Sequence, residues 1–86
     1  MVRDLIFRKV RNSIAEIINI SNKFDIKETS SLESDLHMDD LDIARLFTEI
    51  EDIFLIDTSA EEYDDLASNP SITVNDIVTL VEEKLV

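Results

Sequence analysis

Residues 36–50, which read LHMDDLDIARLFTEI, constrain the fold of this chain more than any other stretch. Two aspartates open the stretch, and apolar residues then recur at the three- and four-residue spacing of a helix with one buried side. The predicted buried stripe consists of Leu41, Ala44, Leu46, Phe47, Ile50 and Phe54. Asp39 can cap the free N–H groups of the first turn, and Asp42 completes a capping box. We therefore predict a helix from Asp39 or Asp40 to Phe54, with an acidic side in water.

Three further segments have helical signals. Residues 3–20 carry an apolar stripe at helical spacing, and Ser59 can cap a short helix over 60–66 with Tyr63 and Leu66 inward. Thr73 can cap a last helix, with Asp76 three residues later. The stripe of the first helix is Ile6, Val10, Ile14, Ile17 and Ile18, and that of the last is Val74, Ile77, Val78, Val81 and Leu85.

The connection over residues 21–38 is long for so small a protein. Its isolated apolar residues, Phe24, Ile26, Leu32 and Leu36, are expected to anchor it to the core. With no strand pattern and no repeat, the chain is predicted to be all-α. The architecture is a small four-helix bundle of three main helices and one short helix, forming a single domain over residues 1–86.

The charge of the chain argues against one class of function and favours one kind of partner. A net charge of −12 argues against nucleic-acid binding, which needs a basic surface to neutralise phosphates. Most of the twenty acidic residues lie between Glu28 and Asp65, where Arg45 is the only Lys or Arg. Such an acidic surface attracts basic partners at long range, although solubility alone would also explain it.

The absence of certain residue types excludes further classes of function. The chain has no cysteine, so disulfides and thiolate chemistry are excluded, and no glycine, which phosphate-binding loops and EF-hands need. No apolar run is long enough for a membrane span. His37 is the only histidine and has no nucleophile beside it, so no catalytic or metal-binding residue is assigned. A cytoplasmic monomer that is not an enzyme is expected.

A set of motifs between Leu32 and Val81 resembles the acyl carrier protein family. The family pattern at its attachment site is acidic-Leu-Gly-x-Asp-Ser-Leu-Asp, and residues 35–42 here read DLHMDDLD. The family helix that follows ends in Glu-Glu-x-Phe, and residues 51–54 read EDIF. A short third helix and the Thr-Val start of a fourth come next, at Thr73 and Val74. Order, spacing and acidity together carry the resemblance.

The resemblance implies a four-helix bundle whose second helix begins with a serine that carries a 4'-phosphopantetheine arm. Asp40 stands at that serine position, so the chain as written is expected to hold no phosphopantetheine and no acyl group. The resemblance also implies docking of the second helix on basic surfaces of fatty-acid-, polyketide- or other lipid-synthesis enzymes. The docking positions that carry over are Asp39, Leu41, Asp42, Glu51 and Asp52, with Arg45 in place of a usual acid and His37 in place of the usual glycine.

Three explanations of Asp40 stay open at the level of the sequence. The family member has diverged and lost its serine, or a true acyl carrier protein has had its attachment serine substituted. The third explanation is that an acid in the first turn of a helix is stabilising in itself. A carboxylate also reproduces part of the negative charge of a phosphodiester, so partner docking could persist without cargo.

Overall fold

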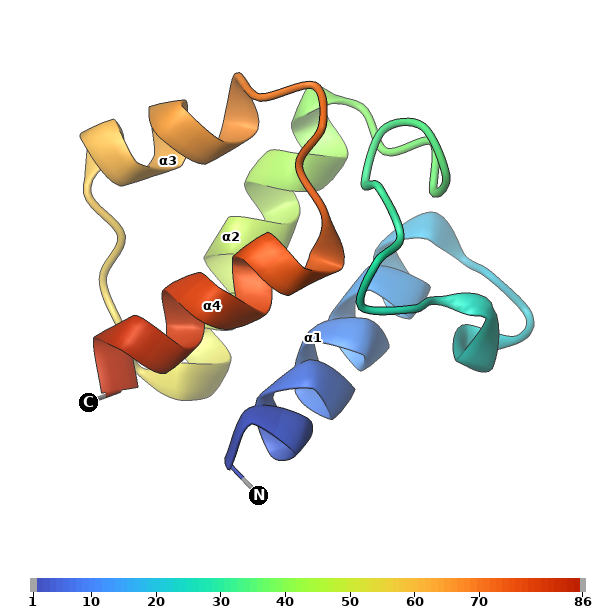
Figure 1. The fold of residues 1–86 in the computed structure, drawn as a ribbon, viewed down its shortest axis with the longest axis horizontal. Helices are drawn as coiled ribbons and strands as arrows, with labels where there is room; N and C mark the ends of the chain where they lie inside the picture. Colours follow the sequence, from blue (N-terminus) through green and yellow to red (C-terminus); the bar gives the residue numbers. More distant parts are fainter. Residues whose placement is uncertain (1, 86) are drawn as a thin grey trace.

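Four α-helices make up the fold in a computed structural model, which describes residues 2–85 (Figure 1). They are α1 (Val2–Ile18), α2 (Asp40–Phe54), α3 (Ala60–Ala67) and α4 (Val74–Leu85), and a single 3₁₀ turn, η1 (Lys23–Asp25), lies in the connection after α1. Within residues 2–85 the extended backbone pairing is limited to one isolated bridge, between Ser31 and Thr73. The predicted all-α bundle of three long helices and one short helix is confirmed.

The predicted caps are present at three helix starts. The Asp42 N–H donates to the Asp39 carboxylate at 2.9 Å, and the Asp39 N–H donates back to Asp42 at 3.3 Å. Ser59 and Glu62 form the same reciprocal pair at α3, and Thr73 and Asp76 form it before α4. Each pair satisfies N–H groups that a helix start leaves without an intrahelical acceptor.

The core lies between α1, α2 and α4, and it corrects parts of the predicted stripes. In α2 the buried residues are Ile43, Leu46, Phe47 and Ile50. Leu41, predicted to be buried, is 80% exposed, and Ala44 and Phe54 are only partly buried. In α4 Leu80 is buried, whereas Leu85 is 46% exposed because it lies in the last turn, at the edge of the bundle.

The long connection is tied to the start of α4 by backbone hydrogen bonds. The Leu32 N–H donates to the Ile72 carbonyl at 3.0 Å, and the Val74 N–H donates to the Ser30 carbonyl at 3.0 Å. Ile26, Leu32 and Leu36 are buried as predicted, but the predicted anchor Phe24 is 60% exposed. Buried apolar side chains and backbone pairing together hold the segment that leads into α2.

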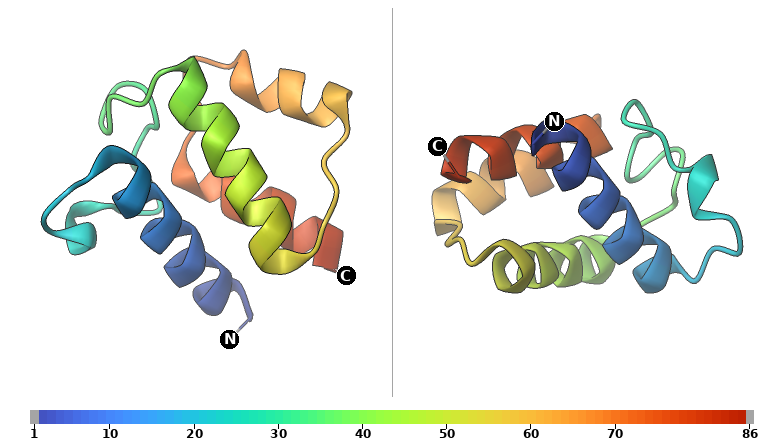
Figure 2. Two further views of the ribbon diagram at one scale, coloured as in Figure 1. Left: turned by 180° about the vertical axis from the view of Figure 1, so that it is seen from behind. Right: turned by 90° about the horizontal axis from the view of Figure 1, so that it is seen from below.

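The short helix α3 sits at the edge of the bundle, and none of its residues is fully buried. It contacts α2 chiefly through Tyr63, whose ring meets Phe47 edge-on with centroids 4.8 Å apart. Tyr63 and Leu66 are partly buried against the core, which agrees with the predicted inward face. Figures 1 and 2 place α3 and η1 on opposite sides of the bundle.

Candidate functional site

Asp40 is the first residue of α2 and is exposed to solvent. Asp39, immediately before it, is the N-cap, so its carboxylate is occupied by the Asp42 N–H. Asp39 is therefore the capping residue of α2, and the Asp40 carboxylate is not part of the capping box. An acid at this place interacts favourably with the positive end of the helix dipole.

His37 has a left-handed backbone, with φ 55°. Its exposed side chain lies outside the core, and its N–H donates to the Glu33 carbonyl at 3.1 Å. Glycine adopts this conformation without the steric penalty that a Cβ atom brings. The turn that leads into α2 thus needs the backbone that favours glycine, although the chain places histidine there. Met38, the next residue, is buried and anchors the turn.

A line of exposed residues runs along α2, away from the core. Leu41, Arg45, Thr48 and Asp52 follow one another at spacings of four, three and four residues, which places them on one side of a helix, and all four are exposed. Arg45 is paired with Glu49 at 3.1 Å. Thr48 and Glu49 were not among the predicted docking residues, and their seven- and eight-residue separations from Leu41 are the signal that could have found them.

The predicted docking acids do not all lie on this exposed line. Asp52 belongs to it, and Asp39 and Asp42 stand at its start, where their carboxylates also make the capping box. Glu51 lies toward α3 instead, and its carboxylate accepts the Thr58 N–H at 2.8 Å. One oxygen of Glu51 is therefore used to hold the connection between α2 and α3.

Two surface hollows flank α2. One of about 670 Å³ lies between the end of α1 and the turn before α2, and its lining includes Ile18, Leu36, His37 and Asp42. The other, of about 280 Å³, lies between α2 and α3 and is lined in part by Phe47, Glu51 and Tyr63. The first adjoins the start of α2, so a molecule attached or docked there would meet an apolar floor with acidic edges.

One surface acid on α3, Glu62, has a lowered pKa. The hydrogen bond from Lys84, at 2.7 Å, and that from the Ser59 N–H lower the pKa of Glu62. Among residues 2–85 no three potential metal ligands converge. No helix in the described part of the chain has the length and apolar character needed to cross a membrane.

Comparison with known proteins finds an acyl carrier protein that is similar along nearly the whole chain. The chain is 28% identical to an acyl carrier protein of Coprothermobacter proteolyticus over 85 residues, which cover 99% of this chain and 96% of that protein. No protein-family model matches the sequence. The chain is thus similar to an acyl carrier protein along nearly its full length, and its described residues form an all-helical fold.

Proposed function

We propose that this protein is an acyl-carrier-type binding module that docks on lipid- or polyketide-synthesis enzymes through α2 and does not carry an acyl group as written. It is not a catalyst in this proposal, because it supplies a surface and no reacting group. The observation that carries the proposal is Asp40: it is exposed at the first position of α2, where the family pattern has the attachment serine.

The chemistry of Asp40 supports the loss of the arm. Attachment requires a serine hydroxyl to attack the diphosphate of coenzyme A and form a stable phosphodiester. A carboxylate in that place would give a mixed anhydride, which water hydrolyses readily. Its negative charge at the start of α2 still resembles part of the charge of a phosphodiester, so a partner that recognises an anion there retains a contact.

The exposed line on α2 supports docking. Leu41 offers an apolar side chain that is 80% exposed, with the acids Asp39 and Asp42 next to it in the chain, and Asp52 lies about three turns further along the same exposed line. An apolar contact with an acidic rim suits a partner surface with clustered lysines or arginines, and the rim charges chiefly raise the association rate. Arg45 interrupts this rim. A partner adapted to this chain would place an acidic group opposite Arg45.

The first experiment tests the attachment position by mass. The parent chain and Asp40→Ser are each incubated with coenzyme A and a promiscuous phosphopantetheinyl transferase. We expect no mass gain in the parent and a gain of one arm, mapped to residue 40, in the variant. Modification of the parent at Ser31 or Ser34 would overturn the assignment of Asp40, and so would an unmodified variant that is fully folded.

The second experiment tests the docking side with a matched pair. Asp52→Asn removes a charge from the exposed line, and Glu51→Gln removes one from the neighbouring position that faces Thr58. An exposed charge contributes roughly 0.2–1 kcal/mol. We expect Asp52→Asn to lower affinity for a purified fatty-acid-synthesis enzyme modestly at low salt while leaving the melting temperature unchanged. Glu51→Gln should lower the melting temperature more than the affinity.

A triple variant, Asp42→Asn with Glu51→Gln and Asp52→Asn, should weaken binding strongly and flatten its salt dependence. Arg45→Glu should strengthen binding to an enzyme whose docking surface is uniformly basic, and should weaken binding to a partner adapted to the arginine. Affinities at two salt concentrations measure both effects. If the triple variant bound as tightly as the parent, α2 would not be the docking side.

A further inference from the structure

The positive charge of this acidic chain is concentrated on one side. Residues 1–27 contain six of the eight Lys and Arg residues and only three of the twenty Asp and Glu residues. They form α1 and the η1 segment, which lie on the side of the bundle opposite α3 (Figure 2). The remainder of the chain carries seventeen acids and two bases. The molecule is therefore strongly dipolar, with its basic side remote from the acidic short helix.

Two cations of this basic side are held on an aromatic ring. The Arg11 guanidinium lies 4.7 Å from the centroid of the Phe24 ring and 5.2 Å from that of Phe7. The Lys23 ammonium lies 5.7 Å from the Phe24 centroid. Cation–π contacts of this kind orient a cation without neutralising it. Phe24 is 60% exposed and Lys23 is also exposed, whereas Arg11 is partly buried.

These cations have no carboxylate partner. Among residues 2–85 the ion pairs involve neither Arg11 nor Lys23, and the buried Nε of Arg11 has no hydrogen-bond acceptor. A guanidinium normally recognises a carboxylate or phosphate with its fixed fork of N–H groups. In a chain with twenty acidic residues, two oriented cations that form no ion pair among the described residues are an unusual arrangement.

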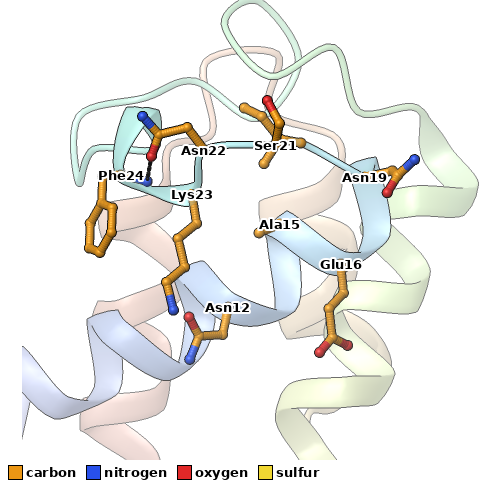
Figure 3. A pocket seen from close by; sticks show the side chains of 9 residues that line it. Asn12, Ala15, Glu16, Asn19, Ser21, Asn22, Lys23 and Phe24 are labelled. Carbon is orange, nitrogen blue, oxygen red and sulfur yellow. Dashed lines mark hydrogen bonds between the residues drawn. The ribbon is translucent and has the colours of Figure 1, made fainter.

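The Phe24 ring separates two open hollows. One of about 620 Å³ lies between α1 and the η1 segment, where the Lys23 side chain extends from η1 toward α1 (Figure 3). The other, of about 590 Å³, is lined by residues that include Phe7, Arg11 and Lys27. Each hollow combines the Phe24 ring with cations and also has acids in its lining, Glu16 in the first and Asp4 and Glu28 in the second. Together the two hollows extend well beyond the size of one small anion, and they fit a run of side chains.

We propose that the surface made by Arg11, Lys23, Phe24 and Lys27 binds a carboxylate-rich segment of a partner protein. Charge complementarity selects this occupant: the segment supplies the carboxylates that Arg11 and Lys23 lack, and its apolar atoms cover Phe24. A second copy of this chain fits less well, since each copy has a net charge of −12 and the contact of a basic side with an acidic side does not close. This surface is separate from the exposed line on α2.

The test uses a labelled poly-glutamate peptide as the probe and nuclear magnetic resonance of the isotope-labelled full chain as the readout. At low salt we expect shift changes centred on Lys23, Phe24 and Arg11, with α2 unaffected because its acids repel the peptide. Lys23→Gln combined with Lys27→Gln should weaken peptide binding several-fold. Lys9→Gln is the matched control: it removes an exposed cation of α1 that lines neither hollow, and binding should stay close to that of the parent.

Several outcomes would overturn the proposal. Equal weakening by Lys9→Gln would mean that the peptide senses only the general charge of α1. The same shifts and affinity with inorganic phosphate would indicate a small-anion site, and shifts that grow with protein concentration alone would indicate self-association. Absence of any shift at Phe24 would exclude the site. If α2 did not bind a synthesis enzyme, the proposed function would be overturned. Binding of the poly-glutamate peptide near Phe24 would be unaffected by that outcome.

Discussion

Three residues in this glycine-free chain adopt the left-handed backbone that glycine favours: Asn19, His37 and Leu55, each with φ 55°. They end α1, shape the turn before α2 and end α2, respectively. Asparagine tolerates this region, but leucine and histidine carry a steric penalty there.

Leu55 offers a direct measure of that penalty. Its side chain is 89% exposed and its N–H donates to the Glu51 carbonyl. Removal of the side chain should therefore change stability mainly through the backbone conformation and not through lost packing. Leu55→Gly should raise the free energy of unfolding by about 0.5–1 kcal/mol, the relief of strain less the added freedom of the unfolded chain. Urea unfolding measures it. Thr48→Gly, in the exposed middle of α2, should instead lower stability by roughly 0.3 kcal/mol, the difference between the helix propensities of threonine and glycine. A loss of stability in both variants would contradict the argument.

Glu62 links α3 to α4 and should make that link sensitive to acid. Its pKa is lowered by Lys84 and by the Ser59 N–H. A carboxyl group whose pKa is lower in the folded state stabilises the fold above its unfolded pKa of about 4.3, and the contribution is lost as pH falls through the folded value. The difference in melting temperature between the parent and Glu62→Gln should therefore be present at neutral pH and shrink on acidification below pH of about 4.3. If the difference in melting temperature stayed constant as the pH fell, the ionisation of Glu62 would not contribute to stability.

At the scale of the elements, α3 has fewer buried residues than the other helices. It has eight residues, none fully buried, and Tyr63, Leu66 and Ala67 are only partly buried against the core. Its other contacts include the edge-on pair of Tyr63 with Phe47 and the ion pair of Glu62 with Lys84. Helices with few buried contacts open locally before the rest of a protein unfolds. We infer that α3 opens independently, next to the hollow between α2 and α3.

Tyr63→Ala should make that opening measurable. Loss of the aromatic pair removes about 0.5–1.5 kcal/mol in addition to the buried area. Amide hydrogen exchange in α3 should speed up markedly, while amides of α1 and α4 keep most of their protection. Asp65→Ala, at an exposed position of the same helix, is the control and should not speed up exchange in α3, because it removes an acid that opposes the helix dipole. Uniform loss of protection across all four helices would show that α3 does not open separately.

At the scale of the whole molecule, the sequence predicted the helices better than their orientation. Caps are local, so Asp39, Ser59 and Thr73 identified three helix starts correctly. In α2, however, the stripe through Leu41 and the one through Ile43 both satisfy helical spacing, and only the packing of α1 and α4 selects Ile43. Phe24 was misplaced for a related reason: its contacts with Arg11 and Lys23 hold it at the surface, and no periodic pattern records them.

The sequence predicted the position of the candidate site but not the arrangement of its side chains. The motif at 35–42 located the start of α2 and the exposed Asp40, since both depend on local sequence. The distribution of the docking acids was not predictable, because the use of Glu51 by Thr58 depends on how the chain turns after α2. The arrangement around Arg11 was also missed, as it joins residues from two segments that the sequence does not place side by side.

The net charge of −12 on a chain of this size should make its stability strongly dependent on salt. Repulsion among surface acids opposes the compact state, and at about 0.1 M salt charges separated by more than about 10 Å are largely screened. Thermal melts by circular dichroism should therefore show a rising melting temperature with ionic strength. Relief of about 1 kcal/mol would correspond to roughly 4–8 °C for a protein of this length.

A variant separates this general repulsion from specific ion binding. Asp64 and Asp65 are exposed in the second half of α3, where acids also oppose the helix dipole. Asp64→Asn with Asp65→Asn should raise the melting temperature at low salt and reduce its further rise on adding sodium chloride. Because screening depends on ionic strength, magnesium chloride and sodium chloride matched in ionic strength should act similarly on the parent. If the melting temperature did not change with salt concentration, or rose with magnesium chloride alone, charge repulsion would not limit the stability of this fold.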